Sequence, residues 1–465
     1  MMQACWELLI DTLFYNGKGR IHWLASSRGW IQDLGTGKPP KHLLAKKKIN
    51  LEGHEIFPGW IDSHVHLYLL GSKKYELDVG FCSSQDELLE ILKGEVTPKT
   101  SGLEVCGWKG SELSLFLLDQ VSSCIPIIVR RVDEHAVWVN TCLLKKANIL
   151  KKYPTGFLAD KAMKHLEPFR PKVSPHEIEA ALMEAEIQLL SDGITSVHDM
   201  ATELLPLKTL ITLMQQKKMN LRVSCALYGK EACNAFPKPQ VNLFNHHLNI
   251  RAKKIFIDGA LGSRGAWLSS PYEDSPGHCG TPLSTEKELV STIRKALQNQ
   301  FQLIFHVLGD QASIFVLEIL NTYFSPKEVR DRRFRFEHLE VCHPKVLPLM
   351  KKFGIIASVQ PWHIVSDRPW LEKRLGKKRM NTVGIFDKMK KKGIPLCGGS
   401  DTPIEPHDPR LVKKFVHFYT VGGAYAEFSE DTKGTLEIGK LADFSVRSKE
   451  KTEMTVVGGE VVYAR

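Results

Sequence analysis

The sequence contains no long apolar run, no paired-cysteine motif and no low-complexity segment. No apolar stretch approaches the roughly 20 residues that a membrane-spanning helix needs. Glu7 and Asp11 interrupt the apolar residues near the N-terminus, which excludes a secretory signal core there. The 10 cysteines never form C-x-x-C, so they favour buried thiols in a reducing compartment over disulfides or a zinc knuckle. We therefore expect a cytoplasmic protein without a membrane partner.

Positive charge exceeds negative charge, but its distribution does not indicate nucleic-acid binding. The sequence has 63 Lys and Arg against 52 Asp and Glu, a formal net charge of +11. The excess occurs in short scattered runs at residues 46–48, 390–392 and 413–414, without interleaved aromatic residues. Such runs usually form solvated surfaces. We expect a small-molecule substrate and no nucleic acid, and a homo-oligomer is left open.

The glycine-rich stretch 259–265 lacks the spacing of a phosphate-binding loop. Its glycines, Gly259, Gly262 and Gly265, do not fit G-x-G-x-x-G, and G-K-[ST] does not occur in the chain. We interpret the stretch as a loop that faces the substrate.

His64 and His66 are the most informative residues of the chain. They end a short apolar run that follows the turn residues Pro58 and Gly59. Side chains at positions i and i+2 of a strand leave its same face, so both imidazoles can bind one divalent ion. An isolated H-x-H is often a pair of strand histidines with ordinary hydrogen bonds, but the preceding turn favours a metal site.

Eight short β-branched runs, each ending in polar residues, recur along the chain of 465 residues. They cover residues 60–66, 194–199, 221–228, 254–258, 302–307, 334–338, 355–360 and 395–401. Helix-compatible stretches such as 287–298 and 344–353 separate most of them. This alternation predicts an α/β protein with a closed (β/α)8 TIM barrel, whose functional groups lie at the C-terminal ends of the strands.

Two parts of the chain do not fit this repeat. The interval 71–191 is too long for one crossover and holds its own strands at 103–108 and 127–132, so we expect an inserted subdomain over the barrel mouth. Residues 1–57 and 434–465 are rich in β-type residues and turns. We expect them to form one small β-sandwich-like domain, with the barrel domain spanning 58–433.

Eight ordered motifs carry a resemblance to a known family. They are PGWIDSHVHL from residue 58, VDEHAVWVN from 132, KIFIDGALGSR from 254, IFHVLGD from 304, RFEHLE from 335, SVQPWH from 358, GGSDTPIEPHDP from 398 and KGTLEIGKLADFSV from 433. With them the chain resembles the amidohydrolase superfamily of metal-dependent hydrolases, and within it amidohydrolase family 3, which includes N-substituted formamide deformylase-like proteins. The resemblance runs nearly end to end.

The resemblance implies metal ligands at the ends of five barrel strands. His64 and His66 match the H-x-H pair, and His306 and His338 match a second pair that ligates a second metal or helps to bind substrate. Asp401 matches the aspartate of strand eight, although Ser-Asp-Thr-Pro is also good helix-capping chemistry. The implied cofactor is one or two divalent ions, with zinc as the expected metal.

Lys254 is the remaining ligand that the resemblance implies. An ammonium is repelled by a dication, but a lysine carbamate offers two anionic oxygens that can bridge two metals, as in related amidohydrolases. The alternative is a solvated lysine at a strand end, beside Lys253. The metal count therefore stays open.

These groups suggest a hydrolytic mechanism in which a metal-bound hydroxide attacks a carbonyl or amidine carbon. Asp401 would accept the proton of the water and pass it to the departing amine, and His306 or His338 would stabilise the developing oxyanion. Asp310, His135 and Arg264 are secondary candidates for positioning, for which a structural role is equally compatible with the sequence. His198 has no assigned role.

We predict hydrolysis of a non-peptide, amide-like carbon–nitrogen bond in a small molecule. A heterocyclic amine deaminase is the first alternative, although mononuclear deaminases place a glutamate soon after the strand-five histidine and residues 307–310 contain none. A non-catalytic scaffold relative is the second. The segment 409–415 looks short for the family, which predicts a truncated eighth helix and a more open pocket.

Overall fold

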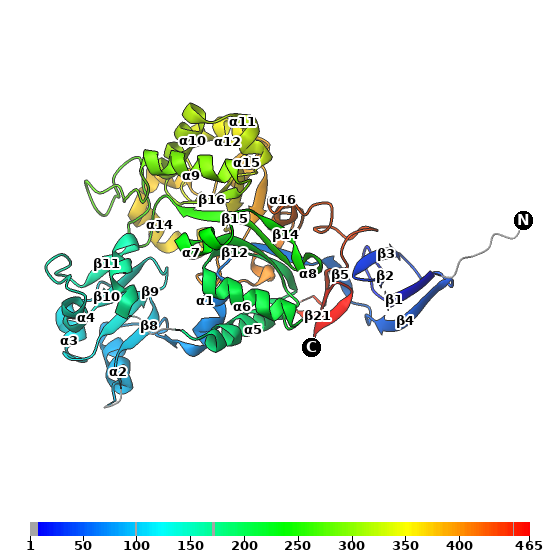
Figure 1. Cartoon of the computed structure of the whole chain (residues 1–465), viewed down its shortest axis with the longest axis horizontal. Helices are drawn as coiled ribbons and strands as arrows, with labels where there is room; N and C mark the ends of the chain where they lie inside the picture. Colours follow the sequence, from blue (N-terminus) through cyan, green and yellow to red (C-terminus); the bar gives the residue numbers. More distant parts are fainter. Residues whose placement is uncertain (1–7, 98–99, 170–172, 450) are drawn as a thin grey trace, which may run out of the picture.

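The centre of the molecule is a barrel of eight parallel strands (Figure 1). The fold is that of a computed structural model, which describes residues 8–97, 100–169, 173–449 and 451–465. In spatial order the strands are β6 (Trp60–Val65), β12 (Ile194–Thr202), β13 (Arg222–Leu227), β15 (Leu248–Phe256), β16 (Gln302–Val307), β17 (Arg335–His338), β18 (Ile356–Val359) and β19 (Leu396–Gly398). Strand order follows chain order throughout, as the sequence predicts for a TIM barrel.

The barrel closes where its last strand meets its first. The Asp401 amide donates to the His64 carbonyl (2.7 Å), and the His66 amide donates to the Thr402 carbonyl (2.9 Å). Val65 and Thr402 form a parallel bridge at the same place. The chain therefore brings the H-x-H segment beside the aspartate of strand eight, although more than three hundred residues separate them.

Seven of the eight predicted strands coincide with observed strands to within a few residues, and β15 is the exception. It was predicted at 254–258 but runs from Leu248 to Phe256. The early part of this strand holds Arg251 and Lys253, whose charges obscure it in the sequence. Their cations lie over the rings of Phe428 and Phe301, at 4.3 and 4.2 Å from the ring centroids, which satisfies both charges within the fold.

Helices between the strands cover the outside of the barrel. They are α5 (Pro175–Ser191), α6 (Leu204–Gln215), α7 (Gly229–Ala235), α9 (Glu286–Gln298), α10 (Asp310–Tyr323), α11 (Pro326–Asp331), α12 (Leu347–Phe353), α14 (Arg368–Leu375) and α15 (Phe386–Lys391). Helix α9, predicted at 287–298, begins with a capping box between Thr285 and Glu288. Buried apolar side chains of these helices and of the strands form one large core. The covered strands are accordingly buried on both faces.

Shorter elements connect these layers. The short α-helices are α1 (Leu67–Ser72), α8 (Leu243–His246), α13 (His363–Ser366) and α16 (Gly423–Ala426), and strand β14 (Gln240–Asn242) pairs with β15. The 3-10 helices are η1 (Lys73–Tyr75), η2 (Asp160–Phe169), η3 (Pro344–Val346), η4 (Lys377–Thr382) and η5 (Pro409–Phe415), and η6 (Phe418–Gly422) is a π-helix. Only η5, η6 and α16 follow β19 before the terminal strands, in keeping with the truncated eighth helix that the sequence predicts.

A second sheet is inserted after the first barrel strand and lies on one side of the barrel (Figure 1). Its strands run in the order β11 (Phe157–Ala159), β10 (Ala136–Val139), β9 (Ile127–Arg131), β8 (Leu103–Trp108) and β7 (Leu77–Asp78), with helices α2 (Gln85–Glu95), α3 (Leu115–Asp119) and α4 (Thr141–Lys146). The strands predicted at 103–108 and 127–132 are present. Helix α5, which the predicted insertion 71–191 included, packs instead into the barrel core through Leu182, Leu189 and Leu190, because its apolar face matches that core.

Two four-stranded sheets lie on the opposite side of the barrel (Figure 1). One has the order β3 (Trp30–Gly35), β2 (Trp23–Ser27), β1 (Leu8–Tyr15) and β4 (Leu43–Asn50). The other has the order β22 (Glu460–Ala464), β21 (Thr452–Val457), β20 (Phe444–Arg447) and β5 (Glu55–Pro58). Phe14 and Phe444 meet edge to face between the two sheets, with ring centroids 4.9 Å apart. Segments from both ends of the chain thus share one core.

In the described parts of the chain, no helix combines the length and apolar character that crossing a membrane would require.

Candidate metal centre

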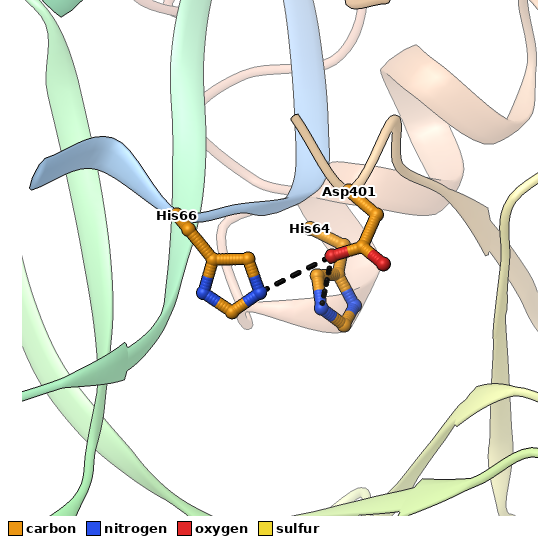
Figure 2. A group of neighbouring side chains, drawn as sticks. All are labelled: His64, His66 and Asp401. Carbon is orange, nitrogen blue, oxygen red and sulfur yellow. Dashed lines mark ion pairs between the residues drawn. The ribbon is translucent and has the colours of Figure 1, made fainter. Parts of the chain in front are cut away.

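Three of the predicted ligands meet at the barrel seam. His64 ends β6, His66 lies two residues later, and Asp401 follows β19. Figure 2 shows the two imidazoles and the carboxylate pointing toward one another. The Nε2 atoms of His64 and His66 each lie 3.2 Å from Asp401 Oδ1. These atoms form one of the groups in the described chain that are close enough together to hold a metal ion.

Hydrogen bonds on the far side of each imidazole fix which nitrogen faces Asp401. The Nδ1 atom of His64 lies 2.5 Å from a Glu337 oxygen, and that of His66 lies 3.0 Å from the Met200 carbonyl. Both partners are acceptors, so each Nδ1 carries the proton and each Nε2 presents a lone pair. Because the Asp401 carboxylate is also an acceptor, three acceptors converge with no proton between them. A cation between them would satisfy all three, so the donor set fits a metal.

A second group extends the centre across the barrel mouth. His338 Nδ1 lies 4.0 Å from Asp401 Oδ2, and His363 Nε2 lies 3.7 Å from the same oxygen. His338 Nε2 and His306 Nδ1 are 3.1 Å apart, so one of them donates to the other. The remaining atoms, His306 Nε2, His338 Nδ1 and His363 Nε2, are buried without a hydrogen-bond partner. Unpartnered buried nitrogens of this kind are suited to a metal ion or a substrate atom.

The electrostatics of the centre favour the protonation states that metal binding needs. Burial and the nearby Lys254 ammonium lower the pKa of His64 to about 4. Burial opposes ionisation of Asp401, but the facing His64 and His66 rings hold the pKa of that carboxyl well below its usual range. At neutral pH the centre therefore offers a neutral His64 imidazole and an ionised Asp401 carboxylate, as metal ligation requires.

Lys254 is buried beside these groups, with 5% of its surface exposed. Burial lowers its pKa to about 8, and the carboxylates of Glu337 and Asp401 oppose that shift. The solvated lysine that the sequence left open as an alternative does not agree with this position. A lowered pKa increases the neutral amine fraction, which is the form that could be carbamylated.

Left-handed backbone conformations place two of the ligands. His338 has φ 72° and Asp401 has φ 65°, a region that non-glycine residues seldom adopt. At His338 the turn of the backbone lets neighbouring Glu337 and His338 both contact the centre, whereas alternate residues of a regular strand face opposite sides. Such strain is found at functional sites, where the surrounding structure holds it in place.

A chain of buried polar contacts supports His64 from below. Glu337 bonds His64 with one oxygen, and its other oxygen accepts from Arg335 at 3.0 Å. Arg335 in turn bonds the Ser63 carbonyl and the Nδ1 atom of His198, both at 2.8 Å. His198, unassigned from the sequence, thus belongs to the structural network beneath the site.

A cavity of about 280 Å³ opens above the centre, close to the lower end of the usual range for small-molecule pockets. The inserted segment contributes Arg131, Asp133 and His135 to its wall, so part of the insertion borders the cavity. His135 Nδ1 lies 2.8 Å from Asp160 Oδ1, and its ring centroid lies 5.1 Å from that of His306. His135 is therefore part of the pocket.

The other two secondary candidates have structural partners. Asp310 accepts from the amide and the hydroxyl of Ser269, and Arg264 pairs with Asp274 at 3.2 Å. Neither lines the cavity. The glycine-rich loop does reach it through Gly262, where an added Cβ would come within 2.6 Å of the Arg131 guanidinium. Its predicted role as a loop facing the substrate is compatible with this position.

Four residues at the site were not predicted from the sequence. They are Glu337, Glu340, His363 and Asp367. Glu337 and Glu340 lie in the RFEHLE segment that ends β17, and His363 begins α13 in the SVQPWH segment. Both segments were noted as motifs, but only tertiary contacts show which of their polar residues reach the centre.

Comparison with known proteins agrees with this geometry. The sequence profile described as "Amidohydrolase family" matches residues 47–463. The chain belongs to the amidohydrolase family. A relative within it is the putative amidohydrolase YtcJ of Bacillus subtilis, which is 29% identical over 485 residues, covering 90% of this chain and 91% of the relative.

Two solved structures share the fold of this amidohydrolase. An uncharacterized metal-dependent hydrolase from Pyrococcus horikoshii has a TM-score of 0.75 at 23% identity, covering 98% of this chain and 99% of that one. Another from Pyrococcus furiosus has a TM-score of 0.73 at 24% identity, covering 95% and 98%. At this level of identity the likeness concerns the fold.

Proposed function

We propose that this amidohydrolase uses a bound divalent ion to hydrolyse a non-peptide, amide-like carbon–nitrogen bond of a small molecule. The observation that carries the proposal is the convergence of two imidazole lone pairs on Asp401 Oδ1, an arrangement of three acceptors that fits a cation. Family membership and the small cavity above these atoms support it.

The residues that would hold the ion are His64, His66 and Asp401, with His306, His338 and Lys254 available for a second ion or for the substrate. When bound, the metal supplies an activated water at neutral pH and polarises the electrophile. Nitrogen and carboxylate ligands in a buried site are typical of zinc, which we propose as the native metal. Carbamylation of Lys254 belongs to the two-metal form of this proposal.

The protein's own groups would move the protons. Asp401 Oδ2, the oxygen farther from His64 and His66 in the ligand set, lies 3.7 Å from His363 and 4.0 Å from His338. It can accept a proton from water and return it to the departing amine, which leaves poorly as an anion. His306 or His338 can donate to the oxyanion through the nitrogen that is not used in ligation.

A metal measurement with a substrate panel tests this function. Wild-type protein purified without chelator should contain zinc, iron or manganese, and His64→Ala should lose most of it. The exposed His42 provides a matched control, because His42→Ala should keep the wild-type metal content. Release of amine from N-formyl and N-acetyl amines should accompany metal loading. Wild-type protein that neither contains nor takes up a metal would favour the scaffold alternative.

A further inference from the structure

Three carboxylates line the outer part of the cavity, beyond the metal ligands. Glu340 follows β17, Asp367 precedes α14 and Glu405 lies after β19, so three separate loops bring them together. Ligand atoms of Glu340, Asp367 and His363 all lie within 4.8 Å of one another. Glu405 accepts from the Ser366 hydroxyl at 2.5 Å and repels both other carboxylates.

The charge of this outer acidic cluster (Glu340, Asp367 and Glu405) is balanced only in part. In the described chain, none of the three forms an ion pair with a lysine or arginine. Burial raises the pKa of Asp367 and the charges of His363 and Arg131 oppose that rise, but Arg131 is itself paired with Asp133 at 2.8 Å. Carboxylates on the wall of a narrow cavity that lack a direct counter-charge attract a positive ligand group.

Two further features of the wall indicate an ammonium ligand. Glu340 is only 3% exposed, and its Oε1 atom is buried without a hydrogen-bond partner. Trp370, one helical turn after Asp367, lines the same cavity, and an aromatic ring beside a cation site can add to its attraction. An ammonium has three N–H donors, which matches three acceptors placed beside an aromatic ring.

We propose that the outer acidic cluster binds a protonated amine of the substrate, so that the enzyme acts on small amides that carry an ammonium group. The inference rests on the proposed function, since it names the substrate class of that same site. His363 belongs to both the outer cluster and the Asp401 group, so the ammonium would lie within an imidazole's width of the metal ligands. The substrate would therefore have only a few bonds between its amine and its scissile amide.

A zinc ion is a competing occupant of the cluster, and the ligand set disfavours it. His363 is the only nitrogen ligand among the three residues of that group, and its Nε2 atom is also one of those facing Asp401. One nitrogen lone pair can bind one ion. If His363 serves the central group, the outer cluster keeps only carboxylates, which suit an ammonium donor well and zinc poorly.

The experiment compares matched pairs of substrates on the metal-loaded enzyme. Each pair consists of a mono-N-formyl diamine with two to four carbons and the N-formyl alkylamine in which a methyl group replaces the ammonium. The ratio of kcat/KM within a pair should be about tenfold or more in favour of the ammonium member. A substrate that is not turned over is compared with the other substrate of its pair by the Kd from calorimetry, so that binding and turnover are measured separately.

Variants of the two less buried carboxylates of the cluster assign the preference to these residues. Asp367→Asn and Glu405→Gln should each reduce the ratio several-fold, and together they should bring it close to one. The exposed Glu318 gives a control, since Glu318→Gln removes a carboxylate that does not line the cavity and should leave the ratio unchanged. The metal content of every variant is measured in parallel.

Three outcomes would overturn the inference. They are a wild-type ratio near one by both kinetics and calorimetry, a ratio that survives in the double variant, and the loss of one metal equivalent in Asp367→Asn. If the ammonium substrates bind more tightly but no substrate is turned over, the proposed hydrolase function is contradicted and the ammonium site stands. If both substrates of a pair are turned over equally well, the hydrolase function stands and the ammonium site is contradicted.

Discussion

At the scale of single residues, the chemistry of the centre depends on which atom of each side chain faces inward. His64 and His66 direct Nε2 lone pairs at Asp401 only because Glu337 and the Met200 carbonyl hold their Nδ1 protons. A change in one of these partners should therefore alter metal binding without removing a ligand.

Replacing Asp401 by asparagine should separate metal binding from turnover. Asparagine keeps the shape and one oxygen, and the histidine ligands remain, so we expect the Asp401→Asn variant to retain metal. It cannot accept a proton from water, and kcat should fall by roughly 10²- to 10⁴-fold. Elemental analysis and amine-release kinetics on the same sample check both expectations. Near-normal turnover would remove Asp401 from the role of base.

Glu337→Gln should weaken metal binding although Glu337 is not a ligand. The amide cannot supply the negative charge that favours the Nδ1 proton of His64, so the affinity for the metal should fall by roughly 10- to 100-fold. Competition with a chromophoric chelator measures this affinity. Because Arg335 loses its buried partner, circular dichroism must first show a folded variant. Unchanged affinity in a folded protein would restrict Glu337 to a structural role.

The residue scale also shows where sequence reasoning stops. His64 and His66 could be predicted as a pair because side chains along a strand alternate with a period of two. The order of the family motifs identified His306, His338 and Asp401. His363 and Glu340 follow no such period, since His363 begins the short helix α13 after β18 and Glu340 lies in the loop after β17. Their approach to the site depends on the conformations of these connections, which a single sequence does not encode in any local pattern.

At the scale of elements, the strands were predictable because β-branched runs buried on both faces stand out from amphipathic helices. Strand β15 was predicted only in part, since its charged residues are satisfied by ring contacts with distant segments. The end of the insertion was likewise misplaced, because whether α5 faces the barrel or the inserted sheet is decided by packing partners.

The pair Arg222 and Asp443 should be important for joining the barrel to the C-terminal sheet. Arg222 of β13 bonds Asp443, just before β20, at 2.6 and 3.0 Å, and both are buried. Asp443→Asn leaves a buried guanidinium without its counter-charge, which should lower the free energy of unfolding by roughly 3–5 kcal/mol. Urea titration monitored by fluorescence measures this loss. The exposed Asp431 gives a control, as Asp431→Asn should change little.

The same pair predicts a pH dependence. Burial opposes ionisation of Asp443, but Arg222 holds the pKa of that carboxyl below its ordinary value of 3.8. A depressed folded-state pKa gives stability that is present above the unfolded-state pKa and is lost as the pH falls below it. The wild-type protein should therefore lose stability below about pH 4 more steeply than Asp443→Asn. If the free energies of unfolding of the two proteins fall equally steeply below about pH 4, this contribution of Asp443 is excluded.

At the scale of the whole molecule, the metal centre lies on the seam that closes the barrel. His64 and His66 come from the first strand and Asp401 follows the last, and few backbone hydrogen bonds join the two strands there. An ion bound by all three would therefore link the ends of the barrel sheet. Strand order, which the sequence predicted, places the site between the first and last strands. Because the barrel closes between those strands, an ion bound there should affect the stability of the fold.

Metal removal should accordingly destabilise the barrel as well as abolish activity. A ligand that binds only the folded state at 100 times its Kd contributes about 2.7 kcal/mol, which corresponds to a fall in Tm of several degrees on chelation. The Asp401 and His66 amides, which bond across the seam, should exchange hydrogen faster in the metal-free protein, and added zinc should reverse both effects. His42→Ala should behave as wild type, whereas His66→Ala should show a smaller difference with and without chelator. Equal Tm values and equal exchange rates with and without the metal would mean that the ion does not stabilise the barrel closure and that the centre serves the reaction alone.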